Sequence, residues 1–93
     1  MLDQALELES AWKRAAGALR DVQTAAAKAN PDYRYMADRV LAASRAATAA
    51  VKLAHEIYTP DAWATAWGAQ RAAEGAAGLL LSSWAPDPKI GVI

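Results

Sequence analysis

The sequence has no cysteine and only one histidine, His55, in its 93 residues. The missing thiols exclude disulfides, thiolate metal sites and cysteine nucleophiles. One histidine without a second nitrogen or sulfur ligand gives little support for a zinc site. No glutamate precedes it by three residues, as the di-iron motif of helical bundles requires. The sequence therefore predicts no metal and no cofactor.

Catalytic motifs are missing as well. None of the four serines lies in a Gly-x-Ser-x-Gly turn, and the single histidine would have to serve as base for any of them. Glycines 68, 75 and 78 fall within a predicted helix, so they do not form a phosphate-binding loop. We therefore expect that the protein is not an enzyme.

Neither an excess of charge nor a long apolar run is present. Ten basic residues balance ten acidic ones, so the chain as a whole does not attract nucleic acid or an anionic membrane. The longest uncharged run, 75–86, is shorter than the roughly 20 apolar residues of a membrane span. Residues 1–12 contain three acids and no basic residue, unlike a secretory signal. We expect no membrane span and a cytoplasmic location.

Alanine occupies 26 of the 93 positions, and it favours helix strongly while burying little area. Two segments, Asn30-Pro31-Asp32 and Thr59-Pro60-Asp61, combine a helix N-cap, a first-turn proline and an acid. They predict helices over residues of about 2–29, 32–58 and 60–84. Nearly equal helices with very short connections must fold back on one another, so residues 1–84 are predicted to form an all-α, up-down-up antiparallel three-helix bundle.

Residues 85–93 are predicted to form an extended C-terminal tail, because prolines 86 and 88 prevent the last helix from continuing. The tail ends in Ile90, Val92 and Ile93, which are large apolar residues. These side chains either fold back onto the bundle or bind a partner, and the sequence leaves both alternatives open.

Each predicted helix has an apolar stripe with three- and four-residue spacing. In the first helix the stripe is Leu8, Trp12, Ala15, Leu19, Val22 and Ala26. In the second it is Met36, Val40, Ala43, Ala47, Val51, Ala54 and Tyr58. In the third it is Trp63, Ala66, Ala69 or Gln70, Ala73, Ala77, Leu80 and Trp84. Placed on the bundle, these stripes predict large side chains at both ends of the core and alanines between them.

The third helix contains the most unusual pattern. Trp63 and Trp67 are one turn apart, and Arg71 follows one turn later. Three glycines share one stripe of the same helix: Gly68, Gly75 and Gly78. Because a glycine inside a helix costs roughly 0.5–1 kcal/mol relative to alanine, something is expected to approach this stripe closely. It is either another helix of the bundle or a helix of a partner protein, and the tryptophans are either core or surface.

Basic residues form stripes on the first two helices. They are Lys13, Arg20, Lys28, Arg34, Arg45 and Lys52. If the two stripes adjoin, they could hold a phosphate backbone or an acidic partner. Two solvated faces with interspersed acids are the favoured alternative. The tight connections also differ from the helix-turn-helix geometry that reads DNA, so nucleic-acid binding is the less favoured function.

We predict a small helical protein–protein interaction module of the accessory, inhibitor, immunity or adaptor type. It would bind its partner through the Trp/Gly/Ala face of residues 63–78 and through the apolar tail, as a homo-oligomer or a hetero-complex. The alternatives are a structural subunit of a larger assembly such as a phage particle and, more weakly, a nucleic-acid-binding protein. Alanine-rich helical immunity and phage accessory proteins have a similar composition, but no motif in this sequence assigns it to a family.

Overall fold

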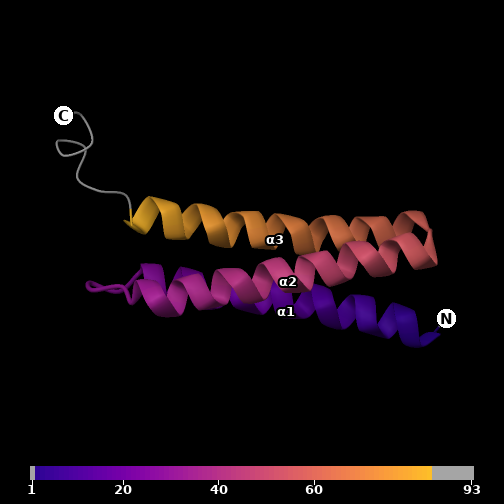
Figure 1. The fold of residues 1–93 in the computed structure, drawn as a ribbon, viewed down its shortest axis with the longest axis horizontal. Helices are drawn as coiled ribbons and strands as arrows, with labels where there is room; N and C mark the ends of the chain where they lie inside the picture. The colour runs from indigo at the N-terminus through magenta and orange to yellow at the C-terminus, as the bar shows by residue number, and fades with distance from the viewer. Residues whose placement is uncertain (1, 85–93) are drawn as a thin grey trace.

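The computed structural model describes residues 2–84, which form three α-helices of 25 residues each: α1 (Leu2–Ala26), α2 (Tyr33–Ile57) and α3 (Pro60–Trp84). Every helix packs against both others. The helices run side by side, with the α1–α2 connection at one end and the α2–α3 connection at the other (Figure 1). The predicted all-α three-helix bundle is therefore confirmed. Within residues 2–84, no helix has the length and apolar character that a membrane span requires.

The connection between α2 and α3 follows the sequence signals closely. Thr59 is the N-cap of α3: its Oγ1 accepts a hydrogen bond from the N–H of Ala62 at 3.2 Å, and its carbonyl accepts one from Trp63 at 3.1 Å. Pro60 takes the first helical position, where a missing N–H costs nothing. The chain therefore reverses direction over two residues, as predicted.

The connection between α1 and α2 is longer than predicted. α1 ends at Ala26 and not at residue 29, because the N–H of Lys28 bonds three residues back, to the carbonyl of Ala25 at 3.2 Å, and closes a tight last turn. The N-cap of α2 is Asp32 and not Asn30, and the Asp32 carboxylate accepts the N–H of the residue three positions later at 3.1 Å. Proline disfavours helical geometry in the residue before it, so the helix begins after the proline and not at Asn30.

Polar contacts at both ends join neighbouring helices. The Gln4 side chain of α1 donates to the Glu56 carboxylate of α2 at 2.9 Å. The hydroxyl of Tyr33, at the start of α2, donates to the Ser83 carbonyl near the end of α3 at 2.9 Å. Exposed contacts of this kind add little stability, but they are consistent with the antiparallel register of both helix pairs.

The core consists almost entirely of alanine. Within the described part of the chain, seventeen apolar residues are buried and fourteen of them are alanines, while the other three are Leu8, Val22 and Met36. The buried alanines are Ala11, Ala15, Ala18, Ala25, Ala43, Ala46, Ala47, Ala50, Ala54, Ala62, Ala66, Ala69, Ala72 and Ala76. Because only methyl groups separate the helices, the backbones lie close together and the core is held by many small contacts.

The predicted stripes therefore include large residues that lie at the edge of the core and not in its centre. In α1, Ala11 and Ala18 are buried, and Trp12 and Leu19 lie next to them on the flank of the helix. At the ends of the core, three large residues of the predicted stripes are exposed, and they are Trp12, Tyr58 and Trp84. The physical reason is size, because an indole or a phenol does not fit between helices that are spaced by methyl groups.

Tyr58 offers a test of the turn that joins α2 to α3. Among the described residues it is the only non-glycine with a positive φ, at 57°, and its side chain is 77% exposed. A left-handed conformation costs a non-glycine residue about 1 kcal/mol, so Tyr58→Gly is expected to raise the free energy of unfolding by about that amount. Urea denaturation followed by circular dichroism measures the change. Tyr58→Ala is the control, since it removes the ring and keeps the strain, and a glycine variant no more stable than the alanine variant would contradict the assignment.

Candidate functional site

The glycines of α3 lie against large side chains of α1. A Cβ added at Gly68 would come within 3.0 Å of Nε1 and 3.2 Å of Cδ1 of Trp12, and one added at Gly75 would lie 3.4 Å from Cδ1 of Leu19. Trp12 and Leu19 are seven residues apart, as are Gly68 and Gly75. Two side chains that lie two turns apart on α1 therefore pack over two glycines that lie two turns apart on the parallel helix α3. At these two glycines the close approach expected from the sequence is made within the bundle.

The two tryptophans at the start of α3 have different surroundings. Trp63 is partly buried and packs against the core, and its ring meets the ring of His55 edge to face, with the centroids 4.7 Å apart. Trp67, one turn later, is 58% exposed. Arg71 and Gly78 are exposed on the same helix. Trp67 is therefore a surface residue, and Trp63 belongs to the flank of the core.

A mainly apolar groove runs between α2 and α3. Val40 and Val51 of α2 and Ala77 of α3 line it, together with the exposed charges of Lys52 and Glu74. We call it the α2–α3 groove.

Large exposed side chains share helix stripes with residues that line the α2–α3 groove. On α3, Trp67 and Leu81 lie seven residues before and seven residues after Glu74, so the three residues share one stripe. On α2, Leu41 lies seven residues before Thr48, which lines the groove. Leu41 and Leu81 are 55% and 64% exposed. The groove and these side chains form one surface, in which apolar and polar residues both take part, and we call it the α2–α3 face.

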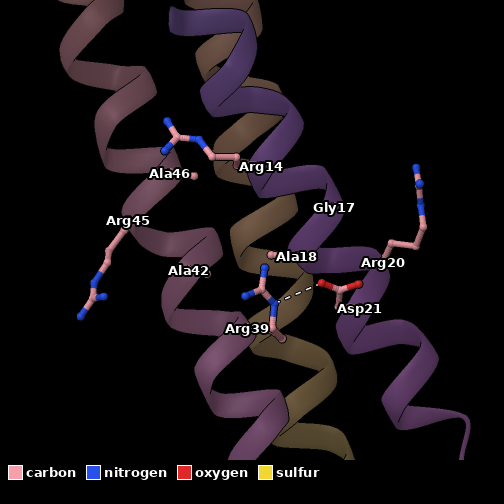
Figure 2. A pocket seen from close by; sticks show the side chains of 9 residues that line it. All are labelled: Arg14, Gly17, Ala18, Arg20, Asp21, Arg39, Ala42, Arg45 and Ala46. Carbon is pink, nitrogen blue, oxygen red and sulfur yellow. Dashed lines mark hydrogen bonds and ion pairs between the residues drawn. The ribbon is translucent and has the colours of Figure 1, made fainter.

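A second groove, of about 500 Å³, runs between α1 and α2, and four of the six arginines of the chain line it (Figure 2). They are Arg14 and Arg20 from α1 and Arg39 and Arg45 from α2. The floor between them consists of small residues: Gly17, Ala18, Ala42 and Ala46. We call this site the arginine groove, and Asp21 is the only acidic residue among its lining residues.

The four arginines differ in how they are held. Arg39 is half-buried, and its Nε donates to the Asp21 carboxylate at 3.1 Å, which joins α2 to α1. The Nε of Arg14 donates to the carbonyl one turn earlier at 3.4 Å, and its guanidinium reaches across the groove toward α2 (Figure 2). Arg20 and Arg45 point away from the groove into solvent and form no ion pair with any residue in 2–84 (Figure 2).

The structure brings together only part of the predicted basic stripes. Arg20 and Arg45 line the arginine groove, whereas four members of the stripes lie elsewhere on the exposed surface: Lys13, Lys28, Arg34 and Lys52. Sequence reasoning missed Arg14 and Arg39, because it compared spacings within one helix. Threading α1 antiparallel to α2 would have placed both residues beside the same groove. The predicted contact residues Ile90, Val92 and Ile93 lie outside the described residues.

Comparison with family models, curated proteins and solved structures finds no match for this chain. Within residues 2–84, no group of three or more histidine, aspartate or glutamate side chains could hold a metal ion. The functional proposals therefore rest on the α2–α3 face and the arginine groove.

Two glycines of α3 form a matched pair for testing the packing of Trp12. Gly78→Ala is expected to raise the free energy of unfolding by about 0.5–1 kcal/mol, because alanine is the better helix former and its methyl group would meet nothing within 4 Å. Gly68→Ala is expected to lose this gain, since the new methyl group must displace the Trp12 indole. Chemical denaturation gives both values, and an equal gain at the two positions would show that Trp12 does not pack on Gly68.

Proposed function

We propose that the protein is a small helical interaction module that binds a partner protein through its α2–α3 face. The main support is the contrast between core and surface. The core is almost entirely alanine, while nine large apolar side chains among residues 2–84 are 39–77% exposed. Clustered exposed apolar residues on a small domain mark interaction sites, and tryptophan is enriched among the residues that dominate binding energy.

Four of these side chains belong to the α2–α3 face, and they are Leu41, Trp67, Leu81 and Trp84. Trp67 and Leu81 are fourteen residues apart on α3, a distance of about 21 Å along the helix. Trp84 follows Leu81 by three residues and is 63% exposed, so it extends the α2–α3 face to the end of α3. A partner helix laid along the α2–α3 groove would cover all three side chains, together with Leu41 on α2.

This face differs from the Trp/Gly/Ala face expected from the sequence. Gly68 and Gly75 are not part of the proposed α2–α3 face, because Trp12 and Leu19 already occupy the space above them. Trp67 stays in it. The proposed contact surface is therefore shifted from the α1 side of α3 to the α2 side.

Substitution of Trp67 tests the proposal. Trp67→Ala is expected to change the free energy of unfolding by less than about 1 kcal/mol, because the side chain is mostly exposed, and to abolish binding of the partner. The control is Tyr35→Ala, which removes an exposed aromatic ring from α2 instead of α3 and should leave partner binding unchanged. Affinity capture from the native host compares the three proteins, and calorimetry with the purified partner measures the affinities.

Two results would count against the α2–α3 face as the binding surface. One is a partner that binds the parent chain and Trp67→Ala with equal affinity. The other is unfolding of Trp67→Ala, which would make this tryptophan part of the stabilising core. Light scattering on the isolated protein separates self-association through the same face from binding to a different protein.

A further inference from the structure

We propose that the arginine groove is a second docking site, and that it takes an acidic α-helical segment of a partner protein. The site is independent of the α2–α3 face, because it lies between a different pair of helices.

The first argument is local charge. Four arginines and one aspartate line the groove, although the chain as a whole has no net charge. Arg20 and Arg45 direct their guanidiniums into solvent, so Arg14 and Arg39 are the two whose guanidiniums face the groove (Figure 2). All of the cations are arginines, whose planar guanidinium binds a carboxylate through two parallel hydrogen bonds, which lysine cannot do. The groove therefore has a charge and a hydrogen-bonding geometry that complement carboxylates.

The second argument is spacing. Arg14 and Arg39 stand at opposite ends of the groove, with the small floor residues between them (Figure 2). Arg39 is paired with Asp21, which is seven residues after Arg14 on α1, so Arg14 and the residue that holds Arg39 are about 10 Å apart along the axis of α1. Acidic residues seven apart on a helix have the same axial spacing and share one face. A helix lying parallel to the groove could therefore pair one carboxylate with each arginine.

The third argument is access for a helix backbone. No long side chain rises from the floor between the arginines. At Gly17 even a Cβ would meet nothing within 4 Å, so the space above it is open. A helix with small residues on its contact side could approach as closely as α1, α2 and α3 approach one another.

The same observations favour an acidic helix over a nucleic-acid backbone. None of the lining residues is aromatic, so none could stack on a base. The neutral chain also lacks the long-range field that gathers a protein onto nucleic acid.

The test uses the full chain and a fluorescein-labelled, alanine-based helical peptide that has glutamates seven residues apart on one face. Fluorescence anisotropy is expected to show saturable binding that weakens with added salt. Arg14→Gln is expected to raise the Kd about tenfold or more, because it removes a charge-assisted contact and no ion pair within the bundle. Arg71→Gln, at an exposed arginine of α3, is the control and should leave the Kd unchanged.

Gly17→Leu separates a docked helix from diffuse attraction between charges. It keeps every charge and places a large side chain in the open floor of the groove, so it is also expected to raise the Kd about tenfold. Circular dichroism confirms that each variant is folded. Trp67→Ala should bind the peptide normally. A negative result with the peptide therefore counts against the arginine groove alone, and loss of partner binding by Trp67→Ala concerns the α2–α3 face alone.

Four outcomes would overturn the proposal. They are the absence of saturable binding, an equal Kd for the peptide with glutamine in place of glutamate, an unchanged Kd for Arg14→Gln, and an unchanged Kd for Gly17→Leu. A short DNA duplex that bound more tightly than the peptide, with the same dependence on Arg14, would show that the groove binds phosphates instead.

Discussion

Alanine methyl groups fill nearly all of the space between the three helices, and this fixes how far apart the helix backbones lie. At that spacing only small side chains fit on the line between two helices, and Val22 and Met36 are the largest that are fully buried. Indole and phenol rings must lie on the flanks or project into solvent. The distribution of large side chains over the surface is thus a direct consequence of the alanine core.

The three seams, one between each pair of helices, differ in which side chains lie along them. In the α1–α3 seam, Trp12 and Leu19 cover the glycines of α3, because a missing Cβ leaves room for them. A groove also lies beside Trp12 and Gly68 in this seam, and the other two seams contain the α2–α3 groove and the arginine groove. The α2–α3 groove is mainly apolar, and the arginine groove is bordered by guanidiniums. The molecule therefore presents two chemically distinct surfaces on one narrow scaffold.

Local signals in the sequence were sufficient to predict the three helices and the shorter connection. Thr59-Pro60-Asp61 starts α3 through contacts within one turn of backbone. The buried stripe was not predictable in the same way. Ala11 and Trp12 are both apolar neighbours, and periodicity alone does not say which of them faces the core. That choice depends on the distance between helices, which emerges only when all three pack together. The contact of Trp12 with Gly68 and the placement of Arg14 and Arg39 beside the same groove also depend on the register between helices. That register cannot be derived from the residue spacing within one helix.

The central claim is that the alanine core holds the bundle together and leaves the large side chains of the α2–α3 face free to bind. The most direct test is the free energy of unfolding of one variant in which Leu41, Trp67, Leu81 and Trp84 are all replaced by glutamine. If the claim is right, urea denaturation shows cooperative unfolding with a free energy within about 2 kcal/mol of the parent chain. A variant that is unfolded or loses cooperativity would contradict it, because these side chains would then be needed to stabilise the bundle.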